Sequence, residues 1–203
     1  MGKSNVKLFA SAVLLALSLS SHAQIKLGVS GPIEGSNAAS MLELLRGAEL
    51  YLDHVNATGG IAGLKVVLVA RNDDFKVEKT VEVVRKLIEE DQVTALFLVR
   101  GTPHNQAILP LVEKHQVPLI APSTGAIAFH EPVNKYVFNV RTAYQLEAEK
   151  LIALLQTIGI TRIAVLNVGD GFGRDVLVGL NKGFAAAKLQ PLVIREFDRD
   201  AAT

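Results

Sequence analysis

The 203-residue chain contains no cysteine, so no disulfide can stabilise it and its hydrophobic core must hold the fold together. It also has little net charge, since 21 lysine and arginine residues face 20 aspartate and glutamate residues. Neither a basic face nor alternating basic and aromatic residues are present, which argues against nucleic-acid binding. Beyond the start of the chain, no apolar run is long enough to span a membrane.

The first 23 residues follow the pattern of a secretory signal peptide. Lys3 and Lys7 form a basic start, residues 8–19 form a short apolar segment, and Ser21-His22-Ala23 resembles a cleavage site. A membrane anchor is the alternative, but the apolar run is shorter than the roughly 20 residues that span a bilayer. We therefore expect cleavage after Ala23 and a periplasmic location.

Strand-like and helix-like segments alternate along the rest of the chain. The predicted strands, rich in valine and isoleucine, are 25–29, 64–70, 93–99, 117–121, 136–140, 162–167 and 192–197. The predicted helices, with apolar residues at helical spacing, are 41–55, 77–88, 103–115, 146–158 and 173–187. This alternation predicts an α/β fold with a largely parallel sheet. Segment 64–70 is almost continuously apolar, which is typical of a strand buried on both faces.

The pattern begins again after residue 140, which predicts two similar lobes. Residues 24–140 would form an N-terminal α/β lobe, and residues 141–203 a hinge and the start of a second α/β lobe. That second lobe would hold about two strands, and a sheet of two strands is poorly stable. We therefore expect a truncated second lobe. The alternative is a small complete domain whose last strand joins the main sheet.

The loops that follow the strands are the candidate ligand site, because open parallel sheets bind ligands beyond the carboxyl ends of their strands. Thr102 is expected to cap a helix that starts at Pro103, and the N-terminus of that helix would attract a carboxylate. Ser123 and Thr124 would add hydroxyl donors, and Gly125 would allow close approach of a ligand. Ordinary capping and turn chemistry is an equally good interpretation of these loops.

Metal and cofactor sites are weakly supported. Asp73 and Asp74 are more typical of solvated loop or capping residues than of a metal or acid–base cluster, and no histidine or cysteine lies at metal-ligand spacing. Residues 169–173 resemble a dinucleotide-binding motif, but its third glycine would fall on Arg174. With Glu196 as a ribose-binding acid, this incomplete motif is the best enzyme alternative. We expect no metal, no cofactor and no enzymatic activity.

The chain resembles the periplasmic solute-binding proteins of ABC transporters, of the leucine/isoleucine/valine-binding type. The segments that carry the resemblance are 28–32, 56–63, 73–74, 101–102, 121–124, 136–141 and 170–173. They cover essentially the whole chain beyond the signal peptide, in order, and segment 56–61 with the acidic pair after it is the most specific. The resemblance implies a Venus-flytrap fold, with two doubly wound parallel-sheet lobes and a first hinge crossing near residues 141–144.

The resemblance also implies a site and a function. Gly101 with Thr102, and the loop 123–125, would grip the ligand from the first lobe; Tyr144 lies at the crossing, and Phe172 would close from the second lobe. Arg100 stands where small or apolar residues are common, which predicts a more polar pocket than one for leucine. The implied function is capture of an amino acid, or a related amide or carboxylate, for a membrane permease. A ligand-sensing regulatory domain of the same fold is the alternative.

Overall fold

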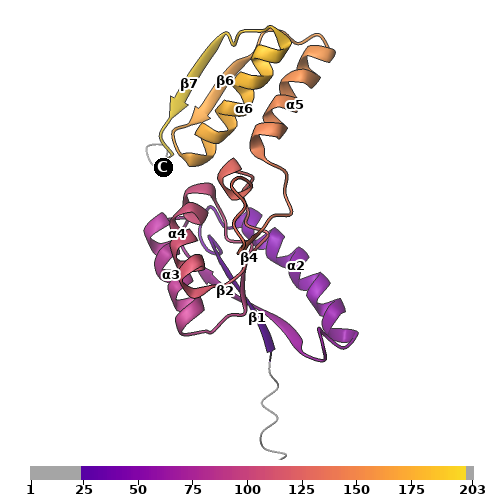
Figure 1. The fold of residues 1–203 in the computed structure, drawn as a ribbon, viewed down its shortest axis with the longest axis vertical. Coiled ribbons are helices and arrows are strands. Elements are labelled where there is room, and N and C mark those ends of the chain that lie inside the picture. The colour runs from indigo at the N-terminus through magenta and orange to yellow at the C-terminus, as the bar shows by residue number, and fades with distance from the viewer. Residues whose placement is uncertain (1–23, 200–203) are drawn as a thin grey trace, which may run out of the picture.

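The computed structural model describes residues 24–199, so the predicted signal peptide and its cleavage site lie outside the described residues. Two groups of helices and strands follow one another along the long axis of the molecule (Figure 1). The first group contains a five-stranded sheet and the second a two-stranded sheet. The predicted alternation of strands and helices is therefore confirmed, and it builds two α/β units.

The five strands of the first sheet are all parallel, in the order β2-β1-β3-β4-β5. Their bounds are Gln24–Gly31 for β1, Lys65–Asn72 for β2, Ala95–Phe97 for β3, Leu119–Ile120 for β4 and Val137–Phe138 for β5. The strand order reverses between β1 and β3. The loops that leave these two strands diverge at that point and open a crevice, where doubly wound sheets bind their ligands.

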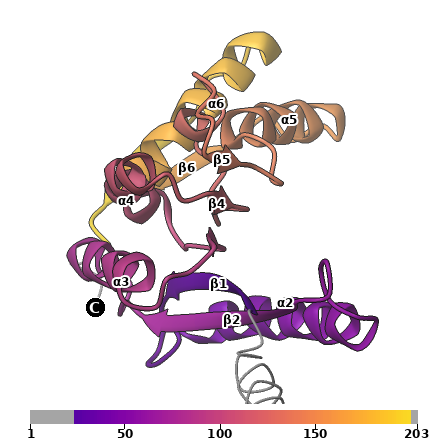
Figure 2. The same cartoon turned by 60° about the horizontal axis from the view of Figure 1, so that its bottom comes forward.

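Three helices cover this sheet on both faces. They are α2 (Ala39–Ala57), α3 (Val77–Glu89) and α4 (Thr102–His115), and a short 3₁₀ helix, η1, spans Ile127–Phe129. Helices α3 and α4 lie together on one side of the strands and α2 lies on the other (Figures 1 and 2). The main core lies under α3 and α4, and its fully buried members include Val84, Leu87, Leu96, Ile108, Val112 and Leu119.

Strand β2 differs from its prediction. Its sequence suggests burial on both faces, but β2 is an edge strand in which only Val66 is buried, while Lys65 and Ala70 are exposed. An edge strand has a neighbour on one side alone, so its apolar residues receive less cover than those of β1 or β3.

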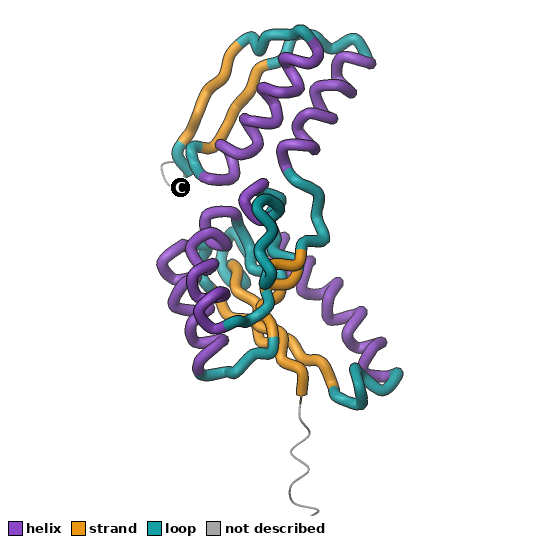
Figure 3. The backbone as a smooth tube through the Cα atoms, in the orientation of Figure 1, coloured by secondary structure: helices purple, strands orange, loops and turns teal. Residues whose placement is uncertain are grey.

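The second group consists of α5 (Tyr144–Thr157), β6 (Ala164–Val168), α6 (Gly171–Ala187) and β7 (Val193–Phe197). Strands β6 and β7 pair in parallel with each other, apart from the first sheet (Figure 3). A separate apolar cluster joins α5 to α6 through Ala148, Ile152, Leu180 and Phe184. The alternative in which the last strand joins the main sheet is therefore wrong. Among residues 24–199, no helix has the length and apolar character needed to cross a membrane.

Candidate functional site

A cavity of about 330 Å³ lies between the two units, at the carboxyl ends of β3 and β4. Five of the seven residues predicted to bind ligand line it, and these are Gly101, Thr102, Ser123, Tyr144 and Phe172. Thr124 and Gly125 lie behind this surface and do not line it. The structure thus brings together residues from the first sheet, the crossing segment and the start of α6.

Gly101 and Thr102 shape the loop after β3. Gly101 has a φ of 93° and occupies the cap position of α4, where no side chain caps the helix. The prediction that Thr102 caps the helix is therefore wrong, because α4 begins one residue earlier, at Thr102 itself. A left-handed backbone at the cap position favours glycine, which frees the threonine hydroxyl for another contact.

That contact is with Thr124. The hydroxyl oxygens of Thr102 and Thr124 lie 2.6 Å apart, and Thr124 Oγ1 also accepts from the amide of Ala126. Both threonines are almost fully buried. Thr124 therefore joins the two loops instead of presenting its hydroxyl to the cavity, and Ser123 is left as the hydroxyl of its loop that faces the cavity.

Gly125 allows another part of the chain to approach closely, and that part is the crossing segment at residues 141–144 rather than a ligand in the cavity. A Cβ atom added to Gly125 would lie 2.6 Å from the carbonyl oxygen of Thr142. The amide of Tyr144 in the same segment donates a hydrogen bond to the carbonyl oxygen of Gly125 over 2.7 Å. The absence of a side chain at Gly125 thus lets the crossing segment attach to the first unit.

Tyr144 and Phe172 form the apolar wall of the cavity. Their rings meet edge to face, with centroids 5.1 Å apart and an interplanar angle of 83°. The guanidinium of Arg141 lies 4.8 Å above the Tyr144 ring and donates to both carboxylate oxygens of Glu147. Both rings belong to the second unit, Tyr144 as the first residue of α5 and Phe172 in α6, and the backbone hydrogen bond from Tyr144 to Gly125 attaches this wall to the first unit.

Asp170 caps α6, which begins two residues earlier than predicted, at Gly171. Its carboxylate accepts from the amide of Gly173 over 3.0 Å and from Arg199 over 2.9 Å. Burial alone raises the pKa of Asp170, but these hydrogen bonds outweigh it and hold the pKa below its ordinary value. Gly173 itself packs against the backbone of Val168, where a Cβ atom has no room. These contacts give the glycines after β6 a structural role.

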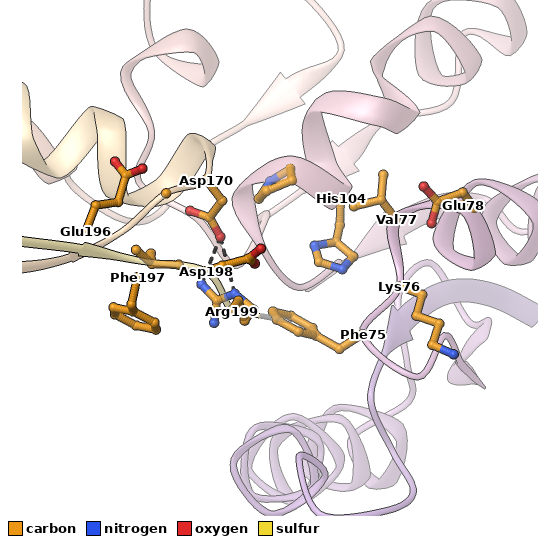
Figure 4. Close-up of a pocket in the computed structure, with 13 residues that line it drawn as sticks. Phe75, Lys76, Val77, Glu78, His104, Asp170, Glu196, Phe197, Asp198 and Arg199 are labelled. Atoms are coloured by element: carbon orange, nitrogen blue, oxygen red, sulfur yellow. Dashed lines mark hydrogen bonds and ion pairs between the residues drawn. The ribbon is translucent and has the colours of Figure 1, made fainter. Parts of the chain in front are cut away.

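A second, larger cavity of about 490 Å³ adjoins the first and contains none of the seven predicted residues. Phe75 stacks on His104 with ring centroids 4.4 Å apart, and the guanidinium of Arg199 lies 5.5 Å from the centroid of the Phe75 ring (Figure 4). Within the described part of the chain, neither ring nitrogen of His104 has a hydrogen-bond partner. Nothing in the sequence indicates that Phe75, His104 and Arg199 lie together, because Arg199 follows β7 and its approach to Phe75 depends on how the two units meet.

The two acids of the predicted loop pair behave differently. Asp74 is exposed and pairs with Lys79 at 2.6 Å, as expected for a solvated loop residue. Asp73 is fully buried, which contradicts that expectation, and it accepts from Ser30, Thr80 and the amide of Phe75. It therefore joins the end of β1 and the loop after β2 to the first turn of α3. In residues 24–199, no three histidine or acidic side chains are grouped to hold a metal ion.

Comparison with known proteins gives a consistent result. The sequence profile of the family described as periplasmic binding protein matches residues 24–202. A substrate-binding periplasmic protein from Ralstonia solanacearum is similar in structure, with a TM-score of 0.81 and 35% identity over 89% of this chain and 51% of that one. A solute-binding protein of an ABC transporter from R. palustris, solved with benzoate, is also similar, with a TM-score of 0.78 and 19% identity. The match covers 87% of this chain and 49% of that one, and at this identity it shows the fold alone.

Curated relatives match shorter parts of the chain. An amino acid binding protein of Pseudomonas aeruginosa is 35% identical over 91 residues, which are 44% of this chain and 24% of that protein. The Leu/Ile/Val-binding protein homolog 8 of Brucella abortus is 44% identical over 75 residues, which are 37% of this chain and 18% of that protein. The chain spans about half the length of the solved structures that it matches. The matched proteins are binding proteins and not enzymes, as the sequence predicted.

Proposed function

Because the chain belongs to the periplasmic binding protein family, we propose that it captures a small solute in the periplasm and delivers it to the permease of an ABC transporter. The observation that carries this proposal is the cavity whose lining comes from both units, with Ser123 on one side and Phe172 on the other. In this proposal, residues 24–140 and 141–203 belong to two lobes that close on the solute by a hinge motion. Such capture needs no covalent chemistry.

The loops of the first lobe are suited to hold a carboxylate. The hydroxyl of Ser123 faces the cavity, and α4 starts beside it with the backbone of Gly101 and Thr102 on the cavity wall. A helix N-terminus carries a partial positive charge that favours an anion. The hydrogen bond between the buried Thr102 and Thr124 hydroxyls holds these two loops at a fixed separation. A ligand would therefore meet a preformed polar surface on this lobe.

The aromatic pair is suited to cover the rest of the solute. Tyr144 and Phe172 contribute two aromatic rings to the lining of the same cavity. Pockets for small molecules combine such apolar walls with a few placed polar groups. Leucine, isoleucine, valine and benzoate, which the relatives' descriptions name, each combine one carboxylate with an apolar body. We propose a solute of that general shape, an amino acid or a related amide or carboxylate.

A thermal-unfolding screen of the purified chain tests this function. Amino acids, amides and small aromatic acids are added in turn, and a solute that binds only the native state raises the melting temperature. Ser123→Ala and Phe172→Ala should each reduce the shift, because they remove a polar and an apolar wall of the cavity. Tyr51→Ala, an exposed aromatic position on α2, is the control and should keep the full shift.

Two results would contradict the proposal. One is a melting temperature that no solute of these classes raises in a chain that unfolds cooperatively. The other is a shift that survives both Ser123→Ala and Phe172→Ala, since the solute would then bind outside this cavity.

A further inference from the structure

Three guanidinium groups line the cavity, and two of them are compensated. Arg141 donates to both oxygens of Glu147, at 3.1 and 2.8 Å. Arg199 donates to Asp170, the only acid among the residues that line this cavity. Each of these arginines therefore has one carboxylate of its own, and together they add no net charge to the site.

Arg100 is the third guanidinium, and within residues 24–199 it has no acidic partner and no hydrogen bond from its side chain. It is half-buried. Its side chain lines this cavity and also a neighbouring one of about 400 Å³, which contains no acid and reaches Ser36, Asn37 and Ser40 at the start of α2. The junction of the two cavities thus carries one uncompensated positive charge.

The backbone fixes Arg100 firmly at this junction. Its amide donates to the carbonyl oxygen of Ser30 at the end of β1, over 3.1 Å, and the residue forms a parallel bridge with Ser123. Arg100 therefore sits at the point where the strand order of the sheet reverses. Laterally paired residues of a parallel pair project to the same side, so the guanidinium and the Ser123 hydroxyl face the same space.

We propose that Arg100 makes the site selective for a small organic anion, a carboxylate of net negative charge, over a zwitterion with no net charge. This inference rests on the proposed function and names the charge of its solute. A carboxylate bonded to a guanidinium gains a charge-assisted hydrogen bond, and the positive charge gains a partner when the lobes exclude water. An ammonium group on the ligand meets the opposite situation, because Arg100 repels it and Asp170 is occupied by Arg199.

The test compares a small anion with a zwitterion in the full chain by titration calorimetry. Benzoate and succinate are the anionic probes, and leucine is the zwitterionic one. We expect benzoate or succinate to bind more tightly than leucine. Arg100→Met should weaken the affinity for the anion by about tenfold or more and change the affinity for leucine little. Arg100→Lys should retain part of the preference, since it keeps the charge but loses the two-pronged donor.

Arg85→Met is the matched control, because Arg85 is an exposed arginine on α3 outside the cavities and its loss changes the net charge equally. It should leave all three affinities unchanged, and circular dichroism checks that each variant folds. Tight binding of leucine that Arg100→Met leaves intact would overturn the inference while leaving solute capture standing. If the folded wild-type chain binds none of the three probes, the inference fails; if no solute in the wider screen raises its melting temperature, capture in this cavity fails as well.

Discussion

The hydroxyl oxygens of Thr102 and Thr124 lie 2.6 Å apart, although 22 residues separate them in the sequence. Thr102 is the first residue of α4 and Thr124 follows β4, so this one bond joins the two loops that form the first-lobe wall of the cavity. Both side chains are buried, at 2% and 1% exposure, and water cannot replace either partner. The bond therefore holds the two loops of the cavity wall together, and the two hydroxyl groups that form it are buried.

Thr102→Val should destabilise the chain by about 1 kcal/mol, because a buried hydroxyl loses its partner. Thr124→Val should cost at least as much, since it also leaves the Ala126 amide without an acceptor. The double variant should cost less than the sum of the two, as expected for residues that share one bond. Urea unfolding measures all three, with Thr161→Val at an exposed position as the control. Strictly additive losses would show that the bond does not form.

The sequence was sufficient for the alternation of strands and helices, because buried strands and amphipathic helices leave a strong periodic pattern. The convergence of loops at the ends of parallel strands also predicted Ser123 at the interlobe cavity, and the family resemblance implied Tyr144 and Phe172 there. The cap of α4 was misassigned because the φ of 93° at Gly101 is a property of the backbone, and threonine is itself a common cap residue. The hydroxyl of Thr102 instead found a partner from a distant loop.

Contacts between the units were the part that sequence reasoning missed. Phe75 lies after β2 and Arg199 after β7, and nothing in either local sequence indicates that the two side chains meet. Gly125 shows the same limit, since its small size was expected to admit a ligand but admits the backbone of Thr142. Such roles depend on the relative placement of two units, which local periodicity does not encode.

The charge of Asp170 should make stability fall in acid. Its pKa lies below the ordinary value when the chain is folded, so its contribution is present above the ordinary pKa and is lost as the pH falls through the lowered one. Asp170→Asn keeps an acceptor for the Gly173 amide but loses the charge that Arg199 contacts. Because Asp170 is partly exposed, we expect the loss at neutral pH to be below about 1 kcal/mol.

Melting temperatures of the wild type and Asp170→Asn, measured from neutral pH downward, test whether the charge of Asp170 stabilises the fold. The difference between them should be present at neutral pH and shrink below about pH 4, where the wild-type carboxylate also becomes protonated. Asp53→Asn, at an exposed position on α2, serves as the comparison. A difference that stays constant in acid would mean that the substitution disturbs the cap geometry rather than the charge.

Gly179→Ala should destabilise the second unit. Helix α6 approaches α5 so closely at Gly179 that an added Cβ atom would collide with the backbone of Gln145, which cannot move like a side chain. Overpacking of this kind costs about 1–3 kcal/mol. Gly47→Ala is the matched control, because Gly47 lies within α2 with open space around it and alanine there should stabilise the helix by up to about 1 kcal/mol. Urea unfolding that ranks the two variants equally would contradict the close packing of α5 on α6.

Phe75→Ala should loosen the contact between the two lobes. Phe75 belongs to the first lobe, and its ring receives the guanidinium of Arg199, which is in turn held by Asp170 at the start of α6 (Figure 4). A cation above an aromatic ring contributes about 0.5–1 kcal/mol at a partly exposed site, so its loss should increase the fraction of molecules with separated lobes.

The chain has no cysteine, so Glu49→Cys on α2 and Asn181→Cys on α6 give one spin label on each lobe without competing thiols. Pulsed electron paramagnetic resonance then measures the distance between the labels in the absence of solute. We expect Phe75→Ala to broaden the distribution toward longer distances, whereas Val133→Ala, at an exposed position outside the interlobe cavity, should not. Identical distributions in the parent and Phe75→Ala would mean that the crossing segment and the hydrogen bond between Tyr144 and Gly125 hold the lobes together without help from Arg199.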